Sequence, residues 1–186
     1  MVSKRYYIAF DEVNPELDRV VVSGIISSHP EDANVYSLRG IKKLNRNDLV
    51  KFFREGGREW YVVSIPRCDI KKKSRKPAIH PIIQAAPKIL RTFMVGRGRH
   101  SLSLDIMLDG NVPRNNEIRD VLTNKKVEIV GVREFPKCQR SSGEYPYTHL
   151  LRVADAVAKN AAETLFSPVK KYSNEESLVL GGNHIF

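Results

Sequence analysis

The sequence predicts an α/β fold built on a mixed sheet of about five strands, with an opening antiparallel hairpin, then parallel strands, and helices on both faces. Two observations predict it. The first two apolar runs are separated by only a short turn, which is typical of a hairpin. In the second half, apolar runs alternate with segments of helical spacing, which indicates parallel strands joined by crossover helices. Residues 1–186 are expected to form one domain, with 173–186 as a loosely attached tail.

Three strands and one helix are predicted in the first part of the chain. Residues 5 to 12 and 19 to 27 are rich in β-branched and aromatic side chains, and an Asn-Pro turn separates them. Residues 47 to 55 have apolar side chains at helical spacing, with an Asn before them and two glycines after them, so they predict a short helix. The next strand covers 60 to 65 and ends at Pro66.

The second part predicts two more strands and three helices. Helical spacing runs from Ile82 to Phe93, although Pro87 disfavours a helix near its start. In residues 101 to 109, large aliphatic side chains alternate with mostly polar ones. This strand is therefore expected to have one apolar face and one face that leads to Asp109. The remaining elements are a helix at about 115 to 123, a strand at 126 to 135 and a long helix at 147 to 166.

The chain is strongly basic, with 31 Lys and Arg against 21 Asp and Glu and a net charge of +10. Such a balance favours a polyanionic partner, such as nucleic acid. Cys68 and Cys138 are isolated, so neither a disulfide framework nor a zinc site is indicated. No apolar run approaches the ~18 residues of a membrane span, and no signal-peptide core precedes the first strand, so a cytoplasmic protein without membrane contact is expected.

Carboxylates close two of the predicted strands. Asp11 and Glu12 follow the first apolar run, and Asp109 ends a later one. Asp155 borders the apolar stripe of the last helix. Because a charge at the rim of a buried sheet needs a donor, a basic group or a cation, these acids together suggest a divalent metal site. Carboxylate oxygens are ligands for hard cations such as Mg²⁺.

Each acid also has a simpler interpretation. Asp11 and Glu12 could begin the turn that follows them, and Asp109 with the next glycine forms a common turn dipeptide. Asp155 could pair with Lys159, which lies four residues further along the helix. Any one of these alternatives is favoured for a single acid, whereas the set of acids at the ends of two strands and on the final helix favours a site.

The order of these motifs resembles the ribonuclease H superfamily, and most closely the type 2 ribonucleases H. Those enzymes open with a strand that ends in Asp-Glu, as in Phe10-Asp11-Glu12 here. A "SKKL" segment and a helix follow, which Gly40-Ile41-Lys42-Lys43-Leu44 resembles. A strand ending in Asp-Gly corresponds to Asp109-Gly110, and an Ala-rich final helix to Ala154-Asp155-Ala156-Val157-Ala158-Lys159. The resemblance spans about residues 5 to 165.

The resemblance implies a nuclease that hydrolyses phosphodiesters with two Mg²⁺ or Mn²⁺ ions about 4 Å apart. Asp11 would bridge both ions, Asp109 and Asp155 would each complete one, and Glu12 would bind the second ion or orient the substrate. The implied substrate is RNA–DNA hybrid or structured DNA. The alternative is a catalytically silent module that keeps the fold and the basic face for nucleic-acid binding.

Two departures from the type 2 pattern concern the substrate. Those enzymes continue Asp-Glu with Ala-Gly-Arg-Gly, which recognises the ribose at an RNA–DNA junction, whereas Val13-Asn14-Pro15-Glu16 stands here. Asp155 falls where those enzymes have a Ser, and it resembles the helix acid of resolvase-like members of the superfamily. The chain therefore looks like a divergent relative.

Basic residues supply candidate contacts to backbone phosphates. The resemblance suggests that Lys42 and Lys43 reach the scissile phosphate. Glycines beside Arg97 and Arg99 allow the backbone to approach a ligand closely. The alternative for each of these residues is a solvated surface charge. The further candidates lie in the most basic run of the chain and directly after Arg99. They are Lys71, Lys72, Lys73, Arg75, Lys76 and His100.

Overall fold

The structure is a computed structural model that describes residues 4–14, 19–39, 44–66, 80–95, 97, 101–110, 112, 116–122, 127–135, 144–164 and 179–182. A six-stranded sheet in the order β6-β5-β1-β2-β4-β8 forms its centre. Its strands are β1 (Lys4–Val13), β2 (Arg19–Ser27), β4 (Arg58–Pro66), β5 (Leu102–Asp109), β6 (Val127–Phe135) and β8 (Val179–Gly182). β1 lies inside the sheet between β2 and β5, so both of its edges are paired.

The strand directions confirm the predicted mixed sheet. β1 and β2 form the expected antiparallel hairpin, in which Phe10 lies opposite Gly24. β5 pairs parallel to β1, and β6 pairs parallel to β5. On the other side β4 pairs antiparallel to β2 and β8 pairs antiparallel to β4, so the antiparallel part extends two strands beyond the predicted hairpin.

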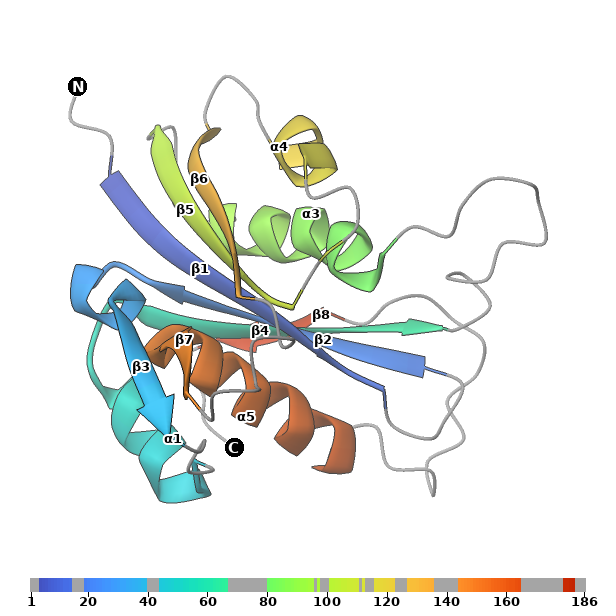
Figure 1. Cartoon of the computed structure of the whole chain (residues 1–186). Coiled ribbons are helices and arrows are strands. Elements are labelled where there is room, and N and C mark those ends of the chain that lie inside the picture. Colours follow the sequence, from blue (N-terminus) through green and yellow to red (C-terminus); the bar gives the residue numbers. More distant parts are fainter. Residues whose placement is uncertain are drawn as a thin grey trace.

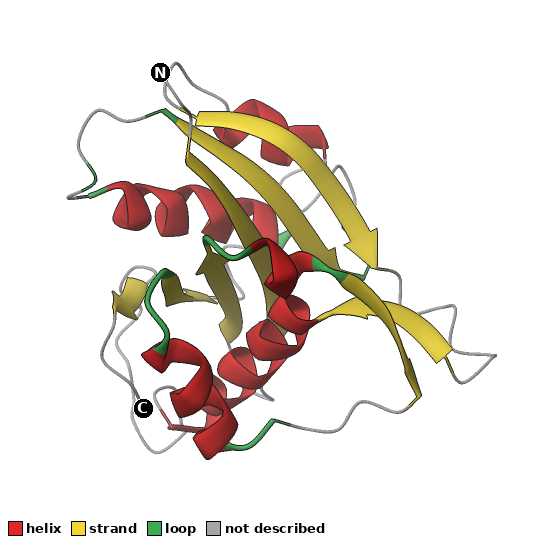
Figure 2. Cartoon of the chain, turned by 90° about the vertical axis from the view of Figure 1, so that its left-hand side faces the viewer, coloured by secondary structure: helices red, strands yellow, loops and turns green. Residues whose placement is uncertain are grey.

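Helices cover both faces of the sheet, as predicted (Figure 1). One face carries α3 (Pro81–Met94) and α4 (Asn116–Leu122), and the other carries α5 (His149–Thr164) and α1 (Arg46–Arg54). Figure 2, turned by 90°, shows the same two layers on either side of the strands. In the described part of the chain, no helix is long and apolar enough to cross a membrane.

The period of two along β1 divides the core into two apolar clusters. Ile8 and Phe10 belong to the cluster that includes the buried face of α3. Ala9 belongs to the cluster that includes Met107 of β5 and Val157 of α5. Alternation therefore directs Asp11, two residues after Ala9, to the face that α5 covers.

α1 and α3 form where the sequence predicts helices. α1 begins with a capping box, in which Asp48 N donates to Asn45 Oδ1 at 3.0 Å and Asn45 N donates to Asp48 Oδ2 at 2.9 Å. α3 begins at Pro81 and continues through Pro87. A proline at its first position is favourable because that N–H has no partner within the helix.

The sequence did not predict the two-stranded sheet of β3 (Val35–Arg39) and β7 (Glu144–Thr148). Its register places Tyr36 opposite Tyr147. The expectation of a helix from residue 147 is therefore wrong at its first two residues. The helix begins at His149, because Thr148 ends the strand and its Oγ1 accepts a hydrogen bond from Leu151 N at 3.2 Å.

Two features add to what the sequence predicts. Within the predicted tail, Val179–Gly182 forms β8 and pairs with β4 at the sheet edge. The face of β5 that leads to Asp109 is buried like the apolar face, because all side chains from Leu102 to Leu108 are buried. Asp105 is 8% exposed and forms ion pairs with Arg5 at 3.2 Å and Arg133 at 3.5 Å, which stabilise its buried charge.

Candidate carboxylate site

Asp11 and Asp109 lie at the ends of two neighbouring parallel strands. The register pairs Phe10 of β1 with Leu108 of β5, so each acid follows directly after a paired residue. Asp11 is 1% exposed and lies opposite Ser23 of β2, so the interpretation that it begins a turn is wrong. Its Oδ1 accepts a hydrogen bond from Glu12 N at 2.8 Å, which fixes the carboxylate against the strand.

Asp155 lies on α5, which packs against β1 and β2. Ser23 Oγ donates a buried hydrogen bond to the Ala154 carbonyl at 2.8 Å, and Ser23 is the residue opposite Asp11. This bond ties the strand pair that carries Asp11 to the helix turn that carries Asp155. The Asp155 side chain is 27% exposed, and its Oδ2 accepts from Lys159 Nζ at 2.6 Å. The alternative pairing with Lys159 is therefore present in the structure.

A buried tyrosine lies within electrostatic range of all three aspartates. Tyr147 in β7 is 5% exposed, and burial raises the pKa of its phenol far above the ordinary value. The negative charges of Asp109, Asp11 and Asp155, in that order, raise this pKa further. All three predicted aspartates thus lie near enough to act on one phenol, although they come from two strands and a helix.

Tyr147 is a candidate site residue that the sequence does not indicate, because the apolar spacing predicts a helix from this residue onward. Pro146 disfavours helical backbone only at Tyr145, and a proline is compatible with the start of a helix, so no local signal separates Tyr147 from the helix.

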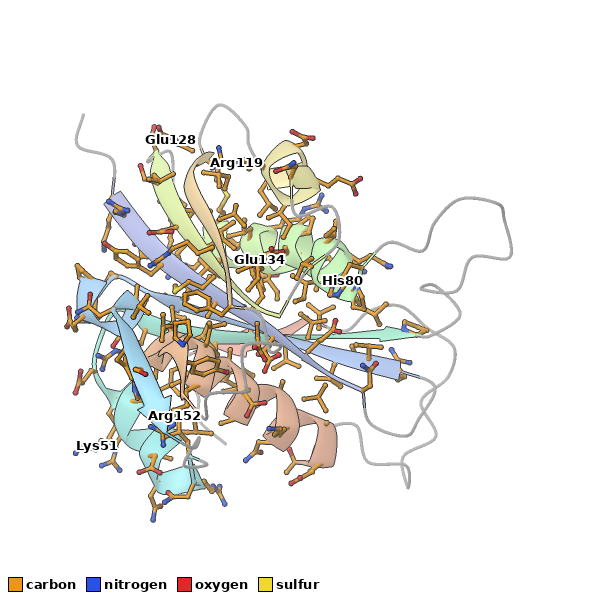
Figure 3. All side chains as sticks on the ribbon, in the orientation of Figure 1. Lys51, His80, Arg119, Glu128, Glu134 and Arg152 are labelled. Atoms are coloured by element: carbon orange, nitrogen blue, oxygen red, sulfur yellow. The ribbon has the colours of Figure 1, made fainter. Side chains whose placement is uncertain are left out.

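The neighbouring side chains on this layer are basic or aromatic. Burial raises the pKa of the Tyr36 phenol, and the charge of Arg152 and its hydrogen bond to this phenol partly offset the effect. Figure 3 shows Arg152 where α5 passes β3. Arg152 precedes Asp155 by three residues, which places the two side chains on the same side of the helix. A positive charge therefore lies near Asp155 on the helix surface.

Glu12 is not brought together with Asp11 by the strand. Successive side chains of a strand point to opposite faces, so Glu12 is directed toward the α3 layer. Its Oε2 lies 3.8 Å from Nδ1 of His80, the residue that caps α3. Figure 3 shows His80 at the beginning of that helix, on the layer opposite Arg152. Glu12 therefore lies on the opposite face of the strand from Asp11 and next to the start of α3.

The chemistry of Asp11, Asp109 and Asp155 fits a hard divalent cation, because carboxylate oxygens are what Mg²⁺ and Mn²⁺ bind. Within the described residues, no three His, Cys, Asp or Glu side chains are gathered closely enough to hold a metal ion. Three like charges repel one another without a cation, and Asp155 is directed to Lys159. The chemistry of the side chains suits the ion, but within the described residues the acids are not positioned to hold it, and Asp155 would have to exchange Lys159 for the cation.

Most of the predicted phosphate contacts lie outside the described residues. Those are Lys42, Lys43, Lys71, Lys72, Lys73, Arg75, Lys76, Arg99 and His100. Arg97 is described, and its guanidinium forms an ion pair with Glu59 and lies over the Phe93 ring at 3.9 Å. Its role in phosphate binding stays a prediction, and the side chain would have to leave Glu59 to reach a phosphate.

No protein-family model and no curated protein sequence matches the chain. Three solved structures are similar to it: a point mutant of Bst-RNase HIII, ribonuclease H2 from Pyrococcus horikoshii OT3, and RNase HII from Archaeoglobus fulgidus in complex with PCNA. Their identities to this chain are 14%, 16% and 14%, and their TM-scores are 0.46, 0.47 and 0.46. The matches cover 88%, 91% and 87% of this chain and 56%, 79% and 73% of those chains.

At such identities and TM-scores, these likenesses concern the fold and say nothing about activity. The chain spans little more than half, 56%, of the RNase HIII protein. The strand order and directions are independent of the comparison, with β1 between an antiparallel partner and a parallel one. The protein has the predicted α/β architecture, a mixed sheet that opens with an antiparallel hairpin, continues with parallel strands and carries helices on both faces.

Proposed function

We propose that this protein is a divalent-metal-dependent nuclease that hydrolyses phosphodiester bonds in RNA–DNA hybrid or structured DNA. The proposal is supported by the placement of Asp11 and Asp109 on adjoining parallel strands, with Asp155 on the helix that Ser23 fastens to the same strand pair. Acids at the ends of two buried strands are costly for the fold unless they serve a purpose, and a cation supplies one. The net charge of +10 supports a polyanionic substrate.

Asp11, Asp109 and Asp155 would hold Mg²⁺ or Mn²⁺ by a two-metal scheme. When bound, the ions supply an activated water and neutralise charge on the leaving oxygen. Asp11 is the best fixed of the three, because it is buried and accepts the Glu12 amide. Glu12, which lies 3.8 Å from His80 on the other side of the strand end, would orient the nucleic acid instead.

Cleavage of an end-labelled RNA–DNA hybrid and of a four-way DNA junction tests the proposal, with Mn²⁺, Mg²⁺ or EDTA present. We expect metal-dependent cleavage that falls at least 100-fold in Asp109→Asn. The matched control is Asp120→Asn, the same change at an exposed position of α4. Circular dichroism establishes that both variants fold. Cleavage that persists in Asp109→Asn would point to a contaminating nuclease and overturn the assignment of the site.

One observation favours a second candidate, the catalytically silent nucleic-acid-binding module. The 2.6 Å pair with Lys159 engages the carboxylate that the metal site needs. In that case no metal ion would support cleavage of either substrate, while hybrid or junction would still bind with strong salt dependence. Filter binding of the same two substrates at several salt concentrations separates the two candidates.

A further inference from the structure

We propose that a cavity between α1 and the start of α5 binds a single nucleobase, which an unpaired nucleotide of the nucleic-acid substrate supplies. The cavity has a volume of about 290 Å³, at the lower end of the range for ligand sites, so it fits one ring system and no longer ligand. This inference rests on the nucleic-acid substrate of the proposed function and needs no bound metal.

Flat side chains form part of the cavity wall. Phe52 of α1 is 6% exposed, and the His149 ring packs edge-on against it with ring centroids 5.3 Å apart. The Arg58 guanidinium group lies over the Phe52 ring at 4.4 Å. Burial lowers the pKa of His149, so its imidazole is uncharged at neutral pH. Because bases stack on aromatic rings and on arginine planes, this wall suits a flat heterocycle.

The guanidinium plane in this wall is held in place from within the protein. Asp32 is 3% exposed and accepts from Arg58 Nε at 2.7 Å and from Arg58 Nη2 at 2.9 Å. The Glu55 carboxylate pairs with the third nitrogen of the same group. A surface that is already rigid in the free protein loses little conformational entropy when a ligand binds.

The charges around the cavity cancel one another. Lys51 and Arg58 contribute two positive charges, and Asp48 and Glu55 contribute two negative ones. Arg58 is moreover already paired with the buried Asp32. A phosphate group or another anion therefore gains no net attraction here, whereas a neutral ligand with hydrogen-bonding edges is well matched.

The two carboxylates at the cavity predict which bases it prefers. Glu55 has a side chain that is 60% exposed, and Asp48 is exposed too. An ionised carboxylate only accepts hydrogen bonds, and it has several lone-pair sites. Adenine, cytosine and guanine carry an amino group that can donate to such an acceptor, whereas thymine carries a methyl group and carbonyl oxygens. We therefore expect a preference for bases that have an amino group.

The cavity lies within reach of a strand that passes the aspartates. His149 is the first residue of α5, and Asp155 follows six residues later, about 9 Å along the helix axis. That distance corresponds to roughly three stacked nucleotides of one strand. Arg152 lies between these two residues on the helix, where its positive charge suits the phosphates that would join the two places.

Fluorescence anisotropy in EDTA tests the proposal, because it measures binding while no cleavage takes place. Three labelled RNA–DNA hybrids differ at one position of the DNA strand, which carries an unpaired adenine, an unpaired thymine or an abasic site. We expect the adenine hybrid to bind at least about fivefold more tightly than the abasic one, the usual contribution of a stacked base. The thymine hybrid should bind less tightly than the adenine hybrid.

Two substitutions separate stacking from hydrogen bonding. His149→Leu keeps an apolar contact with Phe52 but removes the flat ring, so the adenine and abasic hybrids should bind within about twofold of each other. Glu55→Gln replaces an acceptor by a group that also donates, so the preference for adenine over thymine should shrink. Glu163→Gln, the same change at an exposed position near the end of α5, should keep both ratios. Circular dichroism establishes that the variants fold.

Three outcomes would overturn the inference. Equal affinity of the wild type for the adenine and abasic hybrids would mean that no base enters the cavity. Unchanged ratios in both His149→Leu and Glu55→Gln would place the base elsewhere on the protein. Adenosine monophosphate that binds alone as tightly as the adenine hybrid, and is weakened by His149→Leu, would make a free nucleotide the ligand.

The same measurements separate this inference from the proposed nuclease activity. Base-dependent binding that His149→Leu abolishes, in a protein that cleaves with neither Mg²⁺ nor Mn²⁺, would support the cavity as a base site and remove the nuclease. Metal-dependent cleavage by a protein that binds the adenine and abasic hybrids equally would remove the base site and leave the nuclease intact.

Discussion

Nζ of Lys159 lies 2.6 Å from Oδ2 of Asp155, one turn further along α5. The pair occupies a carboxylate oxygen that the proposed metal site requires, so Lys159 and a divalent cation compete for it. The Lys159 side chain is 50% exposed. Pairs of this spacing on a helix surface contribute only about 0.3–0.5 kcal/mol, so a bound ion can displace the ammonium group.

Replacement of Lys159 by Met should therefore strengthen metal binding. Loss of a competitor worth about 0.3–0.5 kcal/mol corresponds to an affinity for Mn²⁺ that is about twofold higher. Calorimetric titration with Mn²⁺ alone checks this, with Lys51→Met on α1 as the control that keeps the wild-type value. Weaker Mn²⁺ binding in Lys159→Met would mean that the ammonium group supports the site instead of competing for it.

A second ion pair stabilises the fold away from the aspartates. Asp32 is 3% exposed and accepts hydrogen bonds from Arg58 Nε at 2.7 Å, from Arg58 Nη2 at 2.9 Å and from Ser27 Oγ at 2.6 Å. Arg58 also lies over the Phe52 ring at 4.4 Å. Removal of the guanidinium leaves a buried carboxylate with one hydroxyl donor and no counter-charge.

Arg58→Met should lower the free energy of unfolding by about 3–5 kcal/mol, the usual effect of removing one partner of a buried pair. Urea unfolding measures the change. Arg54→Met, at an exposed position of α1, serves as the control and should alter stability by less than about 0.5 kcal/mol. A loss of similar size in both variants would refute a special role for the buried pair.

The elements that the sequence predicted are those in which apolar side chains follow a strong local pattern. β2 contains consecutive β-branched residues, and α1 has buried Leu49, Phe52 and Phe53 on one side. β3 and β7 escaped prediction because each has only five residues and owes its pairing to a partner far away in the chain. β8 contains two glycines, which weaken a strand signal, and it takes its place from β4.

The candidate site likewise contains residues that the sequence predicts and one that it does not. Asp11, Asp109 and Asp155 could be named from the sequence because each ends or borders an apolar element. Tyr147 could not, because its place depends on how β7 packs on β5. Glu12 is different, since the period of two along a strand already directs it away from the face of Asp11. That consequence follows from the sequence alone, although Asp11 and Glu12 are adjacent in it.

The free energy of unfolding should depend on pH through His149. Burial, first of all, lowers the pKa of this imidazole below its ordinary value, and the charges of Arg152 and Arg58 lower it further while Asp32 opposes them. The unfolded chain, with a pKa near 6.5, therefore binds a proton at a higher pH than the folded protein does. Stability from this group is complete above the unfolded pKa and is lost as the pH falls from about 6.5 toward the lower folded pKa.

His149→Gln should remove that component. We expect the free energy of unfolding of the wild type to fall more steeply below about pH 6.5 than that of the variant. Urea unfolding of both proteins at a series of pH values checks the difference in slope. Parallel curves through this range would show that the imidazole takes up its proton equally in the folded and unfolded states.

The turn before β4 offers a matched pair of adjacent glycines. Gly57 has a φ of +86°, and an added Cβ would lie 2.4 Å from Oγ of Ser28 and 3.2 Å from Nε2 of His29. The backbone cannot easily shift, because Ser28 N donates to the Gly57 carbonyl at 2.9 Å. At Gly56 an added Cβ would meet nothing within 4 Å.

Gly57→Ala should destabilise the protein by at least about 1–2 kcal/mol, the ordinary cost of left-handed backbone with a Cβ, and the contact with Ser28 adds to it. Gly56→Ala should stay within about 0.5 kcal/mol of wild type. Urea midpoints at equal m-values measure both changes, because equal m-values exclude an effect on the compactness of the unfolded chain. If the two alanines lower the midpoint equally, the left-handed turn at Gly57 is not what holds η1 (Pro30–Ala33) beside the start of β4.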